Sequence, residues 1–374
     1  MLSIDSQFIL NKLYIEPTNR CNLDCLTCMR NSWDEPLGYM PMDLFGQVIE
    51  GLKDFSPVPE VFFGGFGEPL SHPEIIEMVF RAKKAGATVK LITNGILLTP
   101  EMSRELLEAG IDFIWISIDG ATPESYADIR LGAALPRVLH NIKQFNQIIV
   151  SSCYEECCAF VPQYRTRLGI TFVAMKRNIG DLTAVLKMGR DFKVEHILVT
   201  NLLPYTKEMY DEILYANIWD SYGDPSLTLP RMNPKFVSLD DLYREVNTVN
   251  WLESHIANAI NRCPFIDKGC GAISWDGNFS PCLALLHTNT SYVMGYSHST
   301  RSWKIGNVRE HSLKELWYNN DHLAFREKVK KFEFPPCSIC GTCDFFENNE
   351  EDCWGNNFPS CGGCLWAQGL IRCP

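Results

Sequence analysis

The chain has 374 residues, of which 46% are apolar, and its formal net charge is −11 at neutral pH. That length and apolar content suit a globular protein with one large and one smaller part, and they exclude a disordered chain. The acidic balance gives no basis for nucleic-acid binding, and no apolar run is long enough to cross a bilayer. We therefore expect neither a nucleic-acid partner nor a membrane partner.

Sixteen cysteines make up the most informative count in the sequence. The first residues lack the basic, apolar and small-residue regions of a secretory signal, so we expect a cytoplasmic protein. In a reducing compartment, clustered thiols indicate metal binding rather than disulfides. The cysteines do cluster: three lie at 21–28, three at 153–158, three at 263–282 and seven at 337–373.

Short β-branched runs alternate with helical patterns from residue 12 to about residue 200. In 43–53, for example, apolar residues repeat at the spacing of one helix face. Thr99 before Pro100 predicts the start of a helix, and Gly110 predicts its end. The expected strands are 12–17, 60–65, 88–93, 112–119, 169–175 and 195–201.

Six strand–helix alternations predict a parallel sheet whose chemistry lies at the carboxyl ends of its strands. The pattern stops before a full eightfold barrel is complete, so the expected fold class is α/β, with a partial (β/α)6 TIM-like barrel. We expect the barrel at 1–216, a linker and bridging helix at 217–260, and a cysteine-rich domain at 261–374. Periodicity is weak in this last part, where we expect metal to replace a hydrophobic core.

Cys21, Cys25 and Cys28 follow the first expected strand. Spacings of four and three residues let one loop bind three corners of an iron-sulfur cube and leave the fourth iron without a protein ligand. That open iron can bind a substrate or cofactor. Zinc is the alternative metal for such a group of thiols.

The C-x3-C-x2-C pattern in this position resembles the radical S-adenosylmethionine (radical SAM) superfamily. In that family, S-adenosylmethionine binds the unique iron of a [4Fe-4S] cluster, and an electron from the cluster breaks a sulfur–carbon bond to give a 5'-deoxyadenosyl radical. The resemblance implies that Cys21, Cys25 and Cys28 are the catalytic cluster ligands. It also implies a low-potential electron donor such as ferredoxin or flavodoxin. Thr27 departs from the family, which often has an aromatic residue there.

Three further segments stand in the family's order, each at the expected end of a strand. Residues 64–74 read GGFGEPLSHPE and resemble the Gly-Gly-Glu-Pro element, with Phe66 in place of its first glycine. TNG at 93–95 and SIDG at 117–120 follow the next two strands. Each alone is a common turn. Together with the cysteines they imply a pocket for S-adenosylmethionine formed by Phe66, Gly67, Glu68, Pro69, Thr93, Asn94, Ser117, Asp119 and Arg130.

The part from 263 to 373 contains ten thiols, and its paired C-x2-C spacing suits iron-sulfur clusters and zinc sites alike. Behind a radical SAM barrel, it is similar to the SPASM extension, whose Gly-x4-Cys element matches Gly277 and Cys282. By this resemblance, one auxiliary [4Fe-4S] cluster is assigned to Cys263, Cys270, Cys282 and Cys353. A second auxiliary [4Fe-4S] cluster is assigned to Cys337, Cys340, Cys343 and one of Cys361, Cys364 or Cys373.

Residues 274–277 (SWDG), 305–308 (IGNV) and the ending CGGCLWAQGLIRCP resemble the maturases encoded with tungsten-pterin aldehyde oxidoreductases. This resemblance implies an oxidoreductase or maturase that acts on a protein, peptide or cofactor in the maturation of a tungsten-dependent oxidoreductase. The alternatives are a ribosomal-peptide maturase that forms a crosslink or an epimer, and a zinc-binding scaffold without redox chemistry.

Four other residues have open roles. Cys153, Cys157 and Cys158 could form a metal site, although ordinary loop thiols are favoured. His287 could donate a proton near the first auxiliary cluster, although a packed histidine is favoured. Sulfatase-maturing relatives carry an aspartate base where this chain has Leu283, so we do not expect their mechanism.

Overall fold

The computed structural model describes residues 8–156, 159–162, 165–217, 227–228, 261–293, 296–335, 337 and 343–374. Cys157, Cys158, Cys340, the helical pattern at 238–260 and most of the expected linker lie outside the described residues. No helix in the described ranges has the length and apolar character needed to span a bilayer.

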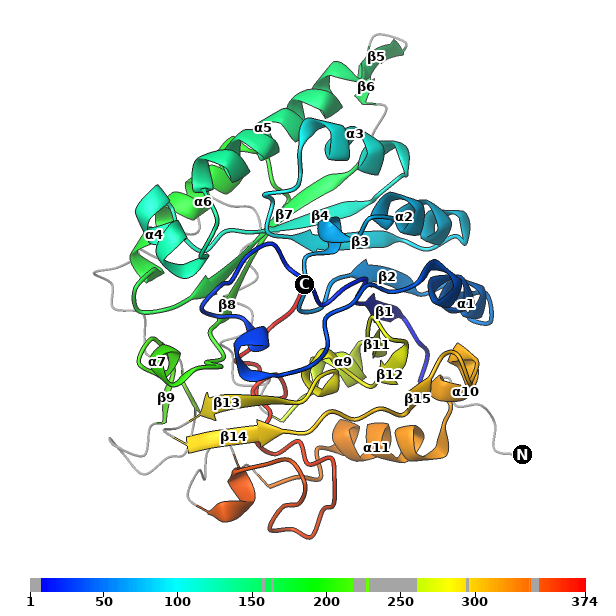
Figure 1. Cartoon of the computed structure of the whole chain (residues 1–374), viewed down its shortest axis with the longest axis vertical. Coiled ribbons are helices and arrows are strands. Elements are labelled where there is room, and N and C mark those ends of the chain that lie inside the picture. Colours follow the sequence, from blue (N-terminus) through cyan, green and yellow to red (C-terminus); the bar gives the residue numbers. More distant parts are fainter. Residues whose placement is uncertain are drawn as a thin grey trace.

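The expected alternation of strands and helices is confirmed, and the fold is α/β with a partial barrel. The parallel strands of the barrel are β1 (Lys12–Ile15), β2 (Glu60–Phe63), β3 (Val89–Thr93), β4 (Phe113–Ser117), β7 (Arg167–Ala174) and β8 (His196–Asn201). The helices between and beside them are α1 (Met42–Leu52), α2 (Ile75–Lys84), α3 (Pro100–Glu108), α4 (Pro123–Ile129), α5 (Leu135–Ser151), α6 (Leu182–Asp191) and α7 (Lys207–Tyr210). Figure 1 shows α1 to α6 along the outside of the curved sheet.

Local sequence signals account for these boundaries. The Thr99 hydroxyl accepts a hydrogen bond from the Met102 N–H at 3.3 Å and so caps α3, whose first residue is Pro100. Gly110 follows this helix with a φ of +85°, a conformation that glycine adopts without strain. The predicted start and end of the helix are therefore correct.

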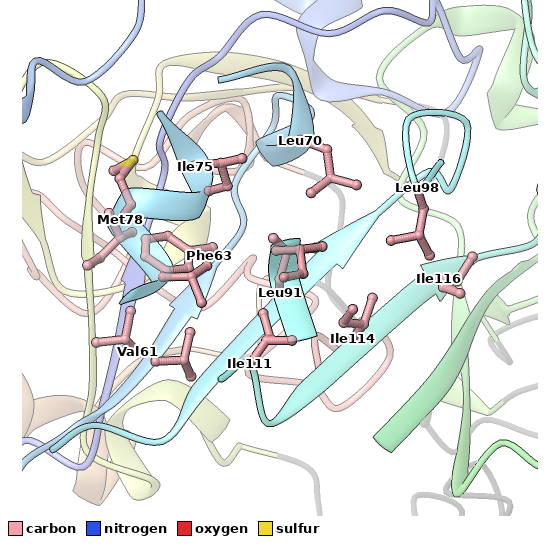
Figure 2. Packing of buried hydrophobic residues seen from close by; sticks show 14 of the residues in the cluster. Val61, Phe63, Leu70, Ile75, Met78, Leu91, Leu98, Ile111, Ile114 and Ile116 are labelled. Carbon is pink, nitrogen blue, oxygen red and sulfur yellow. The ribbon is translucent and has the colours of Figure 1, made fainter. Parts of the chain in front are cut away.

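Alternate residues of each strand point to opposite sides of the sheet. On the outer side they pack beneath the helices in one large apolar cluster. Figure 2 shows part of this cluster, in which side chains of β2, β3 and β4 meet those of α2 and nearby loops: Val61, Phe63, Leu91, Ile114, Ile116, Ile75, Met78, Leu70, Leu98 and Ile111.

The cysteine-rich part contains more regular structure than its sequence predicts. Its elements are α9 (Pro264–Asp267), β11 (Cys270–Ile273), β12 (Asn278–Ser280), β13 (Asn289–Val293), β14 (Tyr296–Thr300), β15 (Gly306–Asn307), α10 (Leu313–Trp317) and α11 (Asn320–Lys331). Short 3-10 turns are η1 (Met29–Ser32), η2 (Pro69–Ser71), η3 (Ile179–Asp181), η6 (Leu283–Leu285) and η7 (Asp344–Phe346). Two short hairpins, β5 (Cys153–Glu156) with β6 (Ala159–Pro162) and β9 (Ala216–Asn217) with β10 (Leu227–Thr228), were also not predicted.

This C-terminal part continues the barrel sheet. Within the described residues, nine strands form one sheet in the order β15-β12-β11-β1-β2-β3-β4-β7-β8. β11 runs parallel to β1, with Lys12 opposite Cys270 and Ile15 opposite Ile273. In Figure 1, β13, β14 and α11 lie across the side that the partial barrel leaves open. The division at 217–260 stays a prediction.

The expectation that metal replaces a hydrophobic core in the C-terminal part is wrong. Tyr14, Phe62 and Trp115, on the inner side of the barrel sheet, share one buried cluster with C-terminal residues such as Phe265 and Trp366. Sequence periodicity misses this core because its members come from short, irregular segments far apart in the chain. The inner side of the barrel therefore depends on the C-terminal part for its packing.

We expect a fragment of residues 1–216 to aggregate, because it would expose the edge of β1 and the apolar inner side of the sheet. Size-exclusion chromatography beside the full chain, together with binding of a hydrophobic dye, would measure this. A monomeric fragment that binds no dye would contradict the shared core.

Candidate active site and iron-sulfur ligands

The loop after β1 carries Cys21, Cys25 and Cys28 at the carboxyl ends of the parallel strands, where the sequence predicts it. Backbone hydrogen bonds hold the loop in place; for example, the Leu26 N–H donates to the Ile129 carbonyl at 3.0 Å. Burial raises the pKa of the Cys28 thiol to about 12. A thiol in this setting becomes a thiolate only when a cation binds it, as a metal ligand does.

A zinc ion and an iron-sulfur cube require different arrangements of their thiolate ligands. Throughout the described ranges, no group of three or more His, Cys, Asp or Glu side chains could hold one metal ion. Zinc requires all its thiolates at about 2.3 Å from one centre. An iron-sulfur cube instead binds each thiolate through a different iron, so its ligands stand further apart.

Gly67 brings the second loop against the cysteine loop. A Cβ atom at this position would lie 2.1 Å from the Thr18 carbonyl oxygen and 2.6 Å from that of Arg20. The next residue, Glu68, donates its N–H to the same Arg20 carbonyl at 2.8 Å. Only glycine permits such a close approach of two backbones.

The Glu68 carboxylate ties this loop to the one after β3. It is buried and accepts hydrogen bonds from the Leu70 N–H at 3.0 Å, the Thr93 hydroxyl at 2.7 Å and the Asn94 N–H at 2.8 Å. Burial raises the pKa of Glu68, and these donated bonds oppose that rise. The Asn94 side chain in turn donates to the Asn22 side chain at 2.8 Å, beside Cys21.

Asp119 and Arg130 form a buried pair on the other side of the cysteine loop. The Arg130 Nη2 lies 2.6 Å from the Asp119 Oδ2, and the Asp119 Oδ1 accepts from the Val173 N–H at 2.8 Å. The Nε atoms of Arg130 and Arg30 are buried without a hydrogen-bond partner. Such donors are costly unless they bind an acceptor, so they suit a ligand that carries a carboxylate.

The other expected pocket residues line the same end of the barrel. Ser117 ends β4, and its hydroxyl accepts a hydrogen bond from the Thr171 hydroxyl at 3.0 Å. Pro69 begins the turn η2. Phe66 donates its N–H to the Glu16 carboxylate at 3.0 Å. The three thiols, the close backbone at Gly67 and the unpartnered guanidinium nitrogens fit an iron-sulfur cluster with S-adenosylmethionine, although each residue's role stays a prediction.

The C-terminal cysteines that the structure describes lie in two pockets, in the core and at the surface. Cys263, Cys282, Cys361 and Cys364 line one cavity. Cys270 and Cys373 line a second pocket, of about 520 Å³, together with Tyr14 on the inner side of the barrel. Cys353 and Cys343 are exposed, and Cys337 is buried beside Gly362.

Cys270 and Cys353, which the SPASM outline places with Cys263 and Cys282, do not line this cavity, and the expected ligand groups stay a prediction. Pairing of β11 with β1 sets Cys270 opposite Lys12. Sequence spacing carries no information on that register. Cys361 and Cys364 line the cavity with Cys263 and Cys282.

Tyr205 is a buried residue that sequence analysis did not single out. Burial raises the pKa of its phenol, and the nearby thiols of Cys373, Cys28 and Cys364 raise it further. The phenol is therefore near both the N-terminal cysteine loop and the C-terminal cysteines. No motif surrounds Tyr205, so only the fold reveals this position.

Comparison with known proteins decides the family. Residues 15–155 match the radical SAM superfamily, and residues 263–344 match SPASM, an iron-sulfur cluster-binding domain. Over 366 residues the chain is 32% identical to the tungsten-containing aldehyde ferredoxin oxidoreductase cofactor-modifying protein of Pyrococcus furiosus, with 97% of this chain and 96% of that protein covered. The chain belongs to the radical SAM superfamily. It is an enzyme whose cofactors are S-adenosylmethionine and iron-sulfur clusters.

More distant matches share sequence or fold with the chain. The Fe-coproporphyrin III synthase of Methanosarcina barkeri is 25% identical over 89% of this chain and 81% of its own length. Streptococcus suis SuiB bound to S-adenosylmethionine shares the fold with a TM-score of 0.61 at 18% identity, over 93% of this chain and 73% of that one. The structure of anSMEcpe with bound AdoMet has a TM-score of 0.61 at 16% identity, over 96% of this chain and 95% of that one.

Gly67→Ala is expected to lower the free energy of unfolding by about 1–3 kcal/mol, because the new methyl group collides with two backbone carbonyls. It should also weaken S-adenosylmethionine binding. Gly46→Ala in α1 is the control: a Cβ there meets nothing within 4 Å, and we expect a gain of about 0.5–1 kcal/mol. Chemical denaturation of both variants measures this, and equal stabilities would contradict the close packing.

Cys364→Ala is expected to remove about four irons per chain, since one cube loses a corner ligand. Cys353→Ala should retain its iron, because Cys353 is exposed and does not line the cavity of Cys263, Cys282, Cys361 and Cys364. Iron analysis after anaerobic reconstitution measures both variants. Equal iron loss in the two would show that this grouping is wrong.

Proposed function

We propose that this enzyme reductively cleaves S-adenosylmethionine and abstracts hydrogen from a protein, peptide or cofactor during maturation of a tungsten-dependent oxidoreductase. The observation that best supports this chemistry is the set of hydrogen bonds at Glu68, which hold the loops after β2 and β3 against the cysteine loop. When bound, the cluster and S-adenosylmethionine supply a 5'-deoxyadenosyl radical. Ferredoxin or flavodoxin is the proposed class of electron donor.

The chain's own residues have distinct proposed roles. Cys21, Cys25 and Cys28 would hold the cluster. Glu68 has both carboxylate oxygens occupied by protein donors, so it positions loops rather than binding a ligand. The unpartnered Nε atom of Arg130 would bind a carboxylate, while Asp119 holds the rest of that guanidinium in place.

The shared apolar core of barrel and C-terminal part would exclude water from the site. A primary carbon radical reacts with whatever lies near it, so a closed surrounding is part of the chemistry. Here the C-terminal part fills the inner side of the barrel with side chains such as Phe265, Leu285 and Trp366. We propose that Cys263, Cys282, Cys361 and Cys364 hold an auxiliary cluster in that region, and that the enzyme holds a second one.

The substrate class rests on the Pyrococcus furiosus relative, which by its name modifies the cofactor of a tungsten enzyme. The similarity spans both the barrel and the C-terminal part. The likeness to SuiB concerns the fold alone, so it does not favour a ribosomal peptide as the substrate. A tungsten-dependent oxidoreductase or its cofactor is therefore the substrate to test first.

Cys25→Ala is expected to abolish 5'-deoxyadenosine formation while leaving the C-terminal clusters largely intact. Thr27→Ala, a change of a non-thiol residue in the same loop, is the control and should still form the product. Anaerobic incubation with S-adenosylmethionine and a reductant, followed by chromatography and iron analysis, measures both. A wild-type enzyme that yields no 5'-deoxyadenosine would refute the proposed chemistry. Complete iron loss in Cys25→Ala would mean that the clusters do not assemble independently.

The substrate proposal has its own expected outcome. Formation of 5'-deoxyadenosine should increase when a tungsten oxidoreductase, or the cofactor extracted from it, is added to the reduced enzyme. Mass spectrometry of both components would locate the change. Modification of a ribosomal precursor peptide, with no effect of the oxidoreductase, would favour the peptide maturase instead.

A further inference from the structure

His287 lies where the C-terminal part meets the barrel, beside the expected S-adenosylmethionine site. It follows the turn η6, and only 3% of its side chain is exposed. Its ring packs edge to face against Trp33 at 4.3 Å and against Phe66 at 5.8 Å between centroids. Trp33 lies just beyond the cysteine loop, and Phe66 opens the element that resembles Gly-Gly-Glu-Pro.

Both nitrogens of this ring face carboxylates. The Nε2 atom lies 2.9 Å from the Glu16 Oε2, and the Nδ1 atom lies 2.5 Å from the Glu35 Oε2. An ionised carboxylate only accepts hydrogen bonds, so both ring nitrogens must carry protons and the ring is an imidazolium. Burial disfavours that charge, but Glu16 and Glu35 overcome the effect and raise the pKa of His287 to about 9.

The two carboxylates connect this charge to three segments. Glu16 directly follows β1 and is 1% exposed. Because its carboxylate is buried, it depends on a buried counter-ion. Its other oxygen accepts the Phe66 N–H at 3.0 Å. Glu35 lies beyond the cysteine loop, and its Oε1 accepts the Thr288 N–H at 3.3 Å. One imidazolium therefore joins the barrel, the segment after the cysteine loop and the C-terminal part.

Phe66 links these ion pairs to the loop that carries Gly67 and Glu68. It stands where the family element has a glycine, directly before Gly67 and Glu68. A large aromatic side chain at that point must be fixed if the loop is to keep its shape. Its backbone is held by Glu16, and its ring packs against Trp33 and His287.

We propose that His287 is a positioning residue for the S-adenosylmethionine site, where its ion pairs with Glu16 and Glu35 hold Phe66 and the segment after the cysteine loop against the C-terminal part. The role assigned to the Phe66 loop rests on the proposed function. His287 itself touches neither the thiols nor the Asp119–Arg130 pair in the described contacts.

The charge state of this group sets its pH range. The charged groups that face it are Glu16 and Glu35, with Lys304 adding to the field at Glu35. Because the folded-state pKa of His287 lies above its ordinary value of 6.5, the stabilisation is fully present below about pH 6.5. It is lost as the pH rises through about 9, where the imidazolium loses its proton.

Two variants separate charge from packing. His287→Phe keeps a ring against Trp33 and Phe66 but removes the charge. Glu35→Gln keeps the histidine and the buried Glu16 pair and removes only the half-buried carboxylate, so it tests the proposal even if His287→Phe does not fold. Arg309→Gln is the control, because Arg309 also joins the C-terminal part to the barrel, through Asp43 at 2.8 Å, but on an exposed surface.

Backbone hydrogen exchange at Phe66 and Thr288 is measured without S-adenosylmethionine, and binding of S-adenosylmethionine to the reconstituted enzyme is measured by calorimetry. In His287→Phe we expect about tenfold faster exchange at Phe66 and about tenfold weaker binding of S-adenosylmethionine. In Glu35→Gln we expect smaller changes in both quantities. In Glu35→Gln, the histidine resonance should titrate at a lower pH than in the wild type. Arg309→Gln should match the wild type throughout.

Wild-type exchange and binding in His287→Phe would overturn the proposal, since packing alone would then suffice. Unchanged exchange at Thr288 and an unchanged histidine titration in Glu35→Gln would overturn it as well. These outcomes are distinct from failure of the proposed function. A wild-type enzyme that forms no 5'-deoxyadenosine would refute the function, while the exchange and titration data would still decide the role of His287.

Discussion

The buried carboxylate of Glu68 is the interaction on which the rest of the site depends. A charge removed from water is tolerated only when donors surround it, and here the donors come from two different loops. Its backbone also reaches the segment before Cys21. One residue, through its side chain and its backbone, thus brings the loops after β1, β2 and β3 together.

The C-terminal part supplies the second constraint. A partial barrel has an open edge and an apolar inner side, and neither is stable in water. Here β11 pairs with that edge, and side chains such as Phe265 and Trp366 fill the inner side. The buried ion pairs of His287 add a polar contact at the same junction. The binding site and the auxiliary cysteines are therefore parts of one packed body.

The barrel and its loops could be predicted from the sequence because each strand and helix carries a local signal, such as the Thr99 cap. Which C-terminal cysteines line the same cavity could not, because that depends on pairing between distant strands, which sets Cys270 opposite Lys12. Glu16 and Glu35 belong to no motif, so their convergence on His287 is invisible in the sequence. The sequence drew attention to this region only through Phe66, which replaces a glycine of the family element, and His287, whose role stayed open.

The pairing of residue 12 with residue 270 also bears on how the protein is made. A ribosome releases the N-terminal strands first, so one edge of β1 stays unpaired until β11 has been synthesised. Contacts between such distant residues form slowly, because a long loop must close before they can stabilise the chain. Until that pairing forms, the edge of β1 that β11 covers in the finished fold stays open to solvent.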